Sequence, residues 1–378
     1  MPDPLRQEII SAAHTVVVKV GTRVLTRPDA TLNTERIARL AEELVSIVES
    51  GRHVVLVSSG AVGAGVGLLQ LDRRPTDVAR LQAVAAVGQT HLIQYYDQVF
   101  TRHGRRAAQV LLTGEDLNNR QRYLNVRNAL HAILEFGAVP IINENDTVAV
   151  DELMITFGDN DRLAAMVTSL IRAPLLVILS DVPGLYNGDP SNPESQLIST
   201  VKKIDDTVLA YVRDKLTGLS KGGMASKLSA AKMVATAGEN CIIASGRQDD
   251  VLTQIMAAEP VGTLFLSQGK AISPYKRWLG FSAQPKGRVS VDDGARRAIV
   301  EQGRSLLAIG VTHVEGKFLK GDVVALYDAQ GQLIGRGLTN YGLEDLNRVK
   351  GLKSDRIAQV LGLEPYAEVI HRDNLAVV

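Results

Sequence analysis

Six short segments, apolar along almost their whole length, constrain the fold more than any other feature of this chain. These segments span residues 15–20, 53–59, 106–112, 138–143, 174–180 and 240–245. A strand buried on one face alternates apolar and polar residues, whereas a strand of a parallel sheet is covered on both faces and is apolar throughout. The six segments therefore predict strands of a buried, mainly parallel sheet.

The stretches between these strands have the periodicity of amphipathic helices. Ile37, Leu40 and Leu44 fall on one helical face, and Asn33 or Thr34 is suited to cap that helix. The same periodicity recurs over residues 77–102, 122–136, 160–172 and 224–237. Alternating strands and helices predict an α/β fold, an open sheet with helices on both faces. We expect this sheet to be complete by residue 245, with one more helix to about residue 258.

The composition changes near residue 268, where a basic, proline-containing stretch begins. The segments "RVSVDDG", "SLLAIGV" and "GDVVALYDAQGQLIGRGL" that follow predict short strands, with a hairpin turn at Asp-Ala-Gln-Gly. We expect a main domain over residues 10–262, a linker over 263–284 and a small, mostly β domain over 285–363.

Composition excludes several classes of protein. The net charge of +1 argues against a general binder of polyanions. Cys241 is the only cysteine, which rules out a disulfide framework. No apolar run approaches eighteen residues, and the histidines have no metal-ligand spacing, so neither a membrane span nor a zinc site is expected. We expect a cytoplasmic protein.

Polar residues follow the carboxyl ends of the predicted strands, where open α/β sheets bind ligands. Lys19 closes the first strand, and the glycine-rich "SSGAVGAGVG" follows the second. "NEND" ends the fourth strand, and "GDND" and "SKGGMASK" open helices. Glycine-rich turns at helix N-termini suit anions, yet neither G-x-x-x-x-G-K-[ST] nor G-x-G-x-x-G occurs. The Asn/Asp clusters are also typical of turns, so their pattern alone leaves both interpretations open.

The order of these motifs resembles the amino-acid kinase superfamily, and in particular its glutamate-phosphorylating branch. The motifs are "VVVKVGTRVLT", "VLVSSGAVGAG", "AVGQ", "YLNVRNAL", "GAVPIINENDTV", "FGDNDRLAA", "LLVILSDVPGLY" and "GGMASKLSAAKM". "KRWLG" and "GRVSVDDGARRAI" are similar to the linker and start of a PUA domain. The resemblance covers nearly the whole chain.

The resemblance implies roles for individual residues. Lys19, Lys227 and Asp161 would be catalytic, with Asp161 holding the two lysines. The substrate-binding residues would be Ser59, Gly60, Asn143, Asp146, Asp159 and Asn160. ATP would be bound by Lys19, Ser180, Asp181, Lys221, Gly222, Gly223, Met224, Ala225, Ser226 and Lys227. Two positions depart from the family pattern: Lys221 adds a charge to the glycine-rich loop, and Ser180 stands where threonine is frequent.

The implied reaction is ATP-dependent phosphorylation of the L-glutamate side-chain carboxylate to L-glutamyl 5-phosphate, the first step of proline biosynthesis. A carboxylate with a pKa of about 4.3 is ionised at neutral pH and needs no general base. Mg²⁺ would accompany the nucleotide, and its protein ligands are left unassigned. We expect Asp146 or Asp159 at the α-ammonium group, and Asn143 and Asn160 nearer the reacting carboxylate.

Two alternatives remain at the level of sequence. A kinase of the same fold could act on aspartate or on an N-acylated glutamate, although an acylated substrate has no ammonium group to match the acids. The chain could instead bind RNA through the PUA-like domain, but residues 285–378 hold 13 basic and 12 acidic residues, so such binding should be weak. The resemblance also implies a homo-oligomer, inhibition by proline and functional coupling to glutamyl phosphate reductase.

Overall fold

The computed structural model describes residues 3–27, 31–148, 160–213, 223–268, 273–361, 366 and 368–377. The chain divides into two compact units. The first comprises Met1–Asp116 and Leu124–Ala271, and the second comprises Leu117–Tyr123 and Ile272–Val378.

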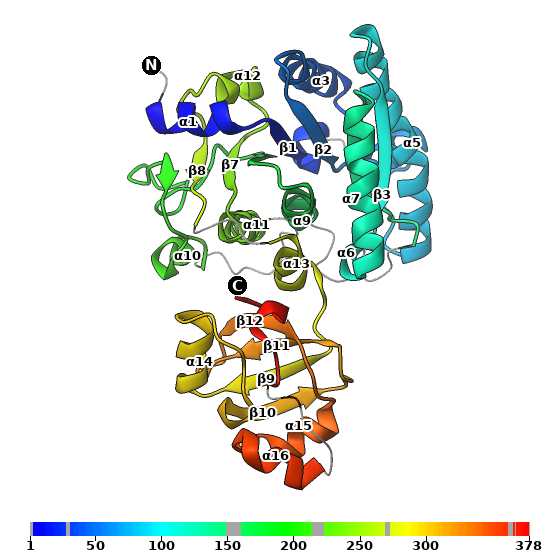
Figure 1. The fold of residues 1–378 in the computed structure, drawn as a ribbon. Coiled ribbons are helices and arrows are strands. Elements are labelled where there is room, and N and C mark those ends of the chain that lie inside the picture. Colours follow the sequence, from blue (N-terminus) through cyan, green and yellow to red (C-terminus); the bar gives the residue numbers. More distant parts are fainter. Residues whose placement is uncertain are drawn as a thin grey trace. The chain divides into compact units, whose positions relative to one another are not determined.

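The first unit is built on an eight-stranded sheet with the order β3-β4-β2-β1-β5-β7-β8-β6 (Figure 1). Its strands are β1 (Thr15–Val20), β2 (His53–Ser58), β3 (Ala107–Leu112), β4 (Val139–Glu144), β5 (Leu175–Ser180), β6 (Thr200–Val201), β7 (Asn240–Ser245) and β8 (Thr263–Phe265). The first six strands in this order pair in parallel, which confirms the predicted fold class.

The prediction that the sheet is complete by residue 245 is wrong. Strand β8 pairs antiparallel with β7, and β6 then pairs with β8. Both are too short, at three and two residues, to produce a recognisable apolar run. The backbone after β8 also belongs to this unit, because the amide of Gln268 donates to the carbonyl oxygen of Ala235 over 2.7 Å.

Helices cover both faces of the sheet, as predicted. Those up to residue 256 are α1 (Pro4–Ala12), α2 (Thr22–Leu25), α3 (Thr34–Glu49), α4 (Ala61–Leu68), α5 (Val78–Arg102), α6 (Gly114–Asn118), α7 (Arg120–Glu135), α9 (Asn160–Ile171), α10 (Asp206–Arg213), α11 (Met224–Ala237) and α12 (Val251–Met256). The expected cap of α3 is Asn33, whose side chain accepts from the amide of Arg36.

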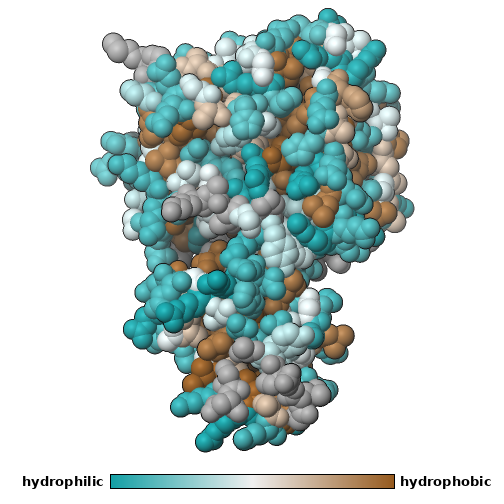
Figure 2. All heavy atoms as spheres, viewed as in Figure 1, coloured by the Kyte–Doolittle hydropathy of each residue, from teal (hydrophilic) through white to brown (hydrophobic). Residues whose placement is uncertain are grey.

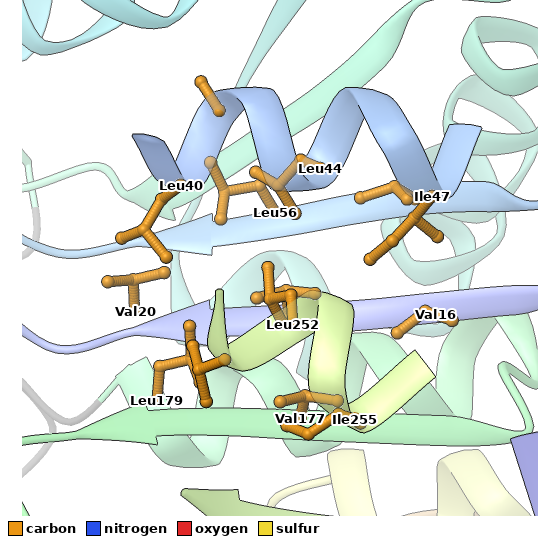
Figure 3. Packing of buried hydrophobic residues seen from close by; sticks show 14 of the residues in the cluster. Val16, Val20, Leu40, Leu44, Ile47, Leu56, Val177, Leu179, Leu252 and Ile255 are labelled. Carbon is orange, nitrogen blue, oxygen red and sulfur yellow. The ribbon is translucent and has the colours of Figure 1, made fainter. Parts of the chain in front are cut away.

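The two faces of the sheet meet different helices. Val16 and Val20 of β1 pack with Leu40 of α3 and Leu252 of α12 in one buried cluster (Figure 3). Side chains alternate between faces along a strand, so Lys19 lies on the opposite face. Helices α9 and α11 cover that face (Figure 1). The apolar core therefore fixes which helices Lys19 can meet.

Helices α4 and α5 cross at unusually close range. A Cβ atom at Gly65 would lie 1.9 Å from the carbonyl oxygen of Val84, and one at Gly88 would lie 1.9 Å from that of Ala61. Only glycine fits at these two positions. The glycine-rich "AVGAGVGL", which sequence analysis treated as a turn, is consequently a helix pressed against α5.

The second unit contains a five-stranded sheet with the order β10-β9-β11-β12-β13. These strands are β9 (Gly287–Val291), β10 (Val311–Gly316), β11 (Val323–Tyr327), β12 (Leu333–Leu338) and β13 (Leu375–Val377), accompanied by α14 (Asp293–Val300), α15 (Leu343–Val349) and α16 (Ser354–Leu361). The predicted hairpin joins β11 to β12, and the Asp328 side chain accepts from two amides in its turn. The strand predicted at "SLLAIGV" is wrong, because a 3₁₀ turn occupies Ala308–Gly310 and β10 begins at Val311.

The expected linker over residues 263–284 contains regular structure: it begins with strand β8, and residues 274–282 are helical. Helix α13 (Pro274–Arg277) continues into a single π-helical turn, Trp278–Ser282. Trp278, Leu279 and Phe281 are buried, so this segment packs as a structural element.

The face of the molecule shown in Figure 2 is mainly hydrophilic, with hydrophobic side chains in smaller groups. Within the described part of the chain, no helix combines the length and apolar character needed to cross a bilayer.

Candidate functional site

Three charged side chains from β1, α9 and α11 meet in the first unit. Lys19 Nζ lies 2.5 Å from Asp161 Oδ1, and Lys227 Nζ lies 3.0 Å from Asp161 Oδ2. Lys19 is 4% exposed, Lys227 5% and Asp161 fully buried. Sequence analysis grouped these residues on the resemblance alone, and the fold brings them into direct contact.

The local sequence explains why this cluster forms. Lys19 points to the face covered by α9 and α11, and Asp161 is the second residue of α9, where a helix favours negative charge. Lys227 lies in the first turn of α11, where the helix disfavours a cation. The Asp161 carboxylate compensates for that unfavourable position.

The electrostatics of the cluster are dominated by one carboxylate between two ammonium groups. Burial acts to raise the pKa of Asp161, but Lys19 and Lys227 outweigh it and hold the pKa of that carboxyl below its usual value. Ammonium groups held in fixed positions in this way are suited to bind a phosphate through charge-assisted hydrogen bonds.

The beginning of α11 lies beside this cluster. Gly223 is the N-cap of the helix, and Ser226 Oγ donates to Asp161 Oδ2 over 2.9 Å. Met224 and Ala225 form the intervening part of the first turn. The glycine-rich segment thus delivers Ser226 as well as Lys227 to the cluster.

A second, uncharged group of side chains adjoins the cluster through Asn160, the residue before Asp161. Asn160 Nδ2 donates to Ser59 Oγ over 2.8 Å and to Asn143 Oδ1 over 2.9 Å. Asn143 Nδ2 in turn donates to Gln89 Oε1 over 2.7 Å. These four side chains form one continuous chain of hydrogen bonds, which we call the amide chain.

The N-terminus of α4 follows directly after Ser59. Gly60 caps this helix with φ of +110°, a left-handed conformation that favours glycine. A helix that begins here directs amide N–H groups toward the region beyond Ser59. Such groups suit a carboxylate or a phosphate.

Asp146 follows the end of β4 and is half-buried. Burial raises its pKa to about 6, and the positive charge of Arg74 acts in the opposite direction. A carboxylate that is poorly solvated in this way gains from a cationic ligand.

Ser180 and Asp181 form a separate group at the end of β5. Ser180 Oγ donates to Asp181 Oδ1 over 3.2 Å, and Arg23 donates to Asp181 Oδ2 over 3.1 Å. Burial acts to raise the pKa of Asp181, but the bond from Arg23 and other hydrogen bonds hold it below its usual value. Both residues directly follow Leu179, which pairs with Val20 at the end of β1.

The described residues do not offer a carboxylate site for Mg²⁺. No group of three or more histidine, cysteine, aspartate or glutamate side chains among them could hold a metal ion. The Asp161 oxygens are both engaged by ammonium groups.

The structure therefore brings part of the predicted residues together: Lys19, Asp161, Ser226 and Lys227 in the charged cluster, and Ser59, Asn143 and Asn160 in the amide chain. Asp146, Ser180 and Asp181 lie outside both groups. Asp159, Lys221 and Gly222, also predicted site residues, lie outside the described residues. Gln89 was not assigned a role from sequence, although "AVGQ" was among the recognised motifs. The sequence does mark Gln89 by its position: it is a polar residue on the apolar face of α5, four residues after buried Ala85 and three before buried Leu92.

Comparisons with known proteins cover both units. A model of the Amino acid kinase family matches residues 14–245, and a model of the PUA domain matches residues 287–361. Glutamate 5-kinase from Rhodopirellula baltica is 50% identical over 98% of this chain and 95% of the relative. Glutamate 5-kinase from Thermoanaerobacter sp. is 45% identical over 96% of this chain and 97% of the relative. Carbamate kinase from Giardia lamblia bound to AMP-PNP matches 68% of this chain and 100% of that chain, with 19% identity and a TM-score of 0.48.

Proposed function

This chain belongs to the amino acid kinase family, and from that premise we propose that it transfers the γ-phosphoryl group of ATP to the side-chain carboxylate of L-glutamate. The products are ADP and L-glutamyl 5-phosphate, which makes this the first step of proline biosynthesis. The curated relatives are named for this activity and align along nearly the whole chain.

The observation that carries the proposal is the contact between the two halves of the site at the start of α9. Asn160 belongs to the amide chain and Asp161 to the charged cluster. Consecutive residues of one helix thus join groups that can hydrogen-bond an amino-acid acceptor with groups suited to a polyphosphate.

The charged cluster addresses the main obstacle to the reaction. A glutamate carboxylate is a ready nucleophile at neutral pH, but it must approach a triphosphate of the same sign. Lys19 and Lys227 would flank the transferring phosphoryl group and offset the negative charge between donor and acceptor. Asp161 would keep both ammonium groups in place through charge-assisted hydrogen bonds.

The acceptor side provides groups that match each part of glutamate. Ser59, Asn160 and the N-terminus of α4 would receive the reacting carboxylate, and Asp146 would attract the α-ammonium group. Keeping Asp146 for the ammonium end avoids repulsion between two carboxylates. An N-acylated glutamate lacks the ammonium group and would gain nothing from Asp146.

The nucleotide side would comprise Ser180, Asp181 and the first turn of α11. ATP would enter as its Mg²⁺ complex, in which the metal neutralises part of the charge on the phosphate oxygens. Each role of the protein side chains is then binding, orientation or charge compensation, and no side chain has to accept a proton.

The product and the second unit suggest further partners. An acyl phosphate hydrolyses readily in water, so a reductase that consumes L-glutamyl 5-phosphate would be a natural functional partner. The chain would act as a homo-oligomer in the cytoplasm. Any RNA binding by the PUA domain should be weak at physiological salt, because residues 285–378 are nearly neutral.

Coupled ADP release with L-glutamate, L-aspartate and N-acetyl-L-glutamate tests the proposal. We expect ADP release with L-glutamate alone, and hydroxylamine should trap the product as a hydroxamate. Preference for either other acceptor would contradict the assigned substrate. ADP release without hydroxamate would indicate hydrolysis of ATP instead of acyl phosphate formation.

A further inference from the structure

Gln89 forms one end of the amide chain. It directly follows Gly88, where α5 approaches α4 most closely. Its side chain is 93% buried, since only 7% is exposed. Gly88 lets α5 press against α4, and this contact brings Gln89 within 2.7 Å of Asn143. No role in binding or chemistry has yet been given to Gln89.

The hydrogen bonds of the amide chain run in one direction. Gln89 Oε1 accepts from Asn143 Nδ2, which turns Asn143 Oδ1 toward Asn160 Nδ2. Asn160 Nδ2 also donates to Ser59 Oγ, so Ser59 accepts within the chain and keeps its own O–H to donate elsewhere. The orientation of one amide therefore determines that of the next.

The other end of the chain also presents donors. Gln89 Nε2 is buried and finds no hydrogen-bond partner among the described residues. A buried N–H group without an acceptor is costly, and such groups frequently mark a ligand or a functional site. Both free ends of the chain, Gln89 Nε2 and the Ser59 hydroxyl, are thus donors.

We propose that Gln89 is a positioning residue that makes this site select a carboxylate over the corresponding carboxamide. The inference rests on the proposed function and specifies how the acceptor is chosen. An ionised carboxylate has only acceptor oxygens and matches a site that presents donors. A carboxamide brings an NH₂ group, which cannot accept from the Ser59 O–H and so loses the hydrogen bond that a carboxylate oxygen would receive there.

Gln89 acts through its carbonyl oxygen. Without that acceptor, the Asn143 amide can rotate by half a turn and present its NH₂ group to Asn160. The Asn160 amide then turns its oxygen toward Ser59, and the hydroxyl donates into the chain. Ser59 would be left as an acceptor for the ligand, which removes the discrimination against an amide.

The test compares L-glutamate as substrate with L-glutamine as a competitive inhibitor. In Gln89→Met, which keeps the length but loses both polar atoms, the ratio of the glutamine Ki to the glutamate KM should fall about tenfold or more. The KM for ATP should stay within about twofold, because the charged cluster does not involve Gln89. The matched control is Leu92→Val, one turn further along α5, which should lower the Tm and leave the ratio unchanged.

A second variant protects the test against misfolding. Gln89→Glu keeps an acceptor for Asn143 and replaces the spare N–H groups by a carboxylate oxygen. Because that variant still accepts from Asn143, its ratio should stay clearly above that of Gln89→Met. A folded Gln89→Met enzyme with the wild-type ratio, or a Gln89→Glu ratio as low as that of Gln89→Met, would overturn the assignment, even if Tm or kcat were lower.

The same assays separate this inference from the proposed function. A wild-type enzyme that releases no ADP with glutamate would overturn the proposed function and with it the role of Gln89. A wild-type enzyme that phosphorylates glutamate, together with an unchanged ratio in Gln89→Met, would overturn the role of Gln89 alone.

Discussion

Asn160 and Asp161 are neighbours in sequence and begin the same helix, yet their surroundings have opposite character. Asn160 joins a chain of neutral hydrogen-bonding groups that reaches Ser59 and Gln89. Asp161 is enclosed by the ammonium groups of Lys19 and Lys227. Both residues are buried, so solvent does not equalise the two environments.

This difference suggests a division of labour. Neutral hydrogen bonds depend strongly on direction and can distinguish one ligand from another at modest cost. Buried charges act at longer range and are most valuable where charge is concentrated in a transition state. Changes in the amide chain should therefore alter acceptor binding, and changes in the charged cluster should alter turnover.

The largest expected effect follows from removing a charge of the cluster. Lys227→Ala should lower kcat about a thousandfold, because the lost ammonium group would compensate charge on the transferring phosphoryl group. The KM for glutamate should change much less. Steady-state kinetics at saturating ATP measure both quantities.

The control is Lys232→Ala, which removes an exposed lysine of the same helix α11 and should retain wild-type turnover. Near-normal turnover of Lys227→Ala would remove this residue from the chemistry.

An intermediate effect is expected at Asp146, the charged residue that the acceptor side contributes within the described part of the chain. Asp146→Asn should raise the KM for glutamate about tenfold at neutral pH and leave the KM for ATP unchanged, because an exposed or half-buried ion pair contributes modestly.

The pH dependence sharpens this prediction. The pKa of Asp146 is raised by burial to about 6, so the carboxylate becomes protonated as pH falls through that value. It then no longer attracts the α-ammonium group, and kcat/KM for glutamate should decrease. This inflection should be absent from Asp146→Asn. Its persistence in the variant would assign the titration to another group.

The smallest effect should follow from removing the second unit, because the described residues of both halves of the site lie in the first unit. A chain ending at Gln268 should fold and keep kcat within about threefold of the full-length value. The chain is cut after residue 268 because the amides of Leu266 and Gln268 still bond within the first unit. Some stability should be lost, since Leu117–Tyr123 is grouped with the removed residues. A folded but inactive truncation would mean that the second unit contributes to catalysis.

The sequence was most informative where a single physical rule governs a whole segment. Burial on both faces makes each of β1, β2, β4, β5 and β7 a continuous apolar run, and their predicted bounds agree with the structure to within one residue. Strands β6 and β8 lie at one edge of the sheet and are too short for such a run. The helix over Ala61–Leu68 was missed because glycine has a low helical propensity, which close packing against α5 overrides here.

The candidate site was predictable in its chemistry and less so in its connections. The position of Lys19 at a strand end and the amides after β4 indicated a polar site without any structure. The bond from Gln89 to Asn143 spans 54 residues and depends on how closely α4 and α5 approach. Periodicity along one helix carries no information about such a partner, so the amide chain required the fold.

The most direct test of the divided site compares the two neighbours at the start of α9 in one kinetic experiment. Asn160→Ala and Asp161→Asn would each be assayed with glutamate and ATP varied independently. We predict that Asn160→Ala raises the glutamate KM about tenfold with kcat within about threefold of wild type, whereas Asp161→Asn lowers kcat at least about a hundredfold with a much smaller change in glutamate KM. If both variants changed the same kinetic parameter to a similar degree, the site would act as a single unit and the division of labour would be contradicted.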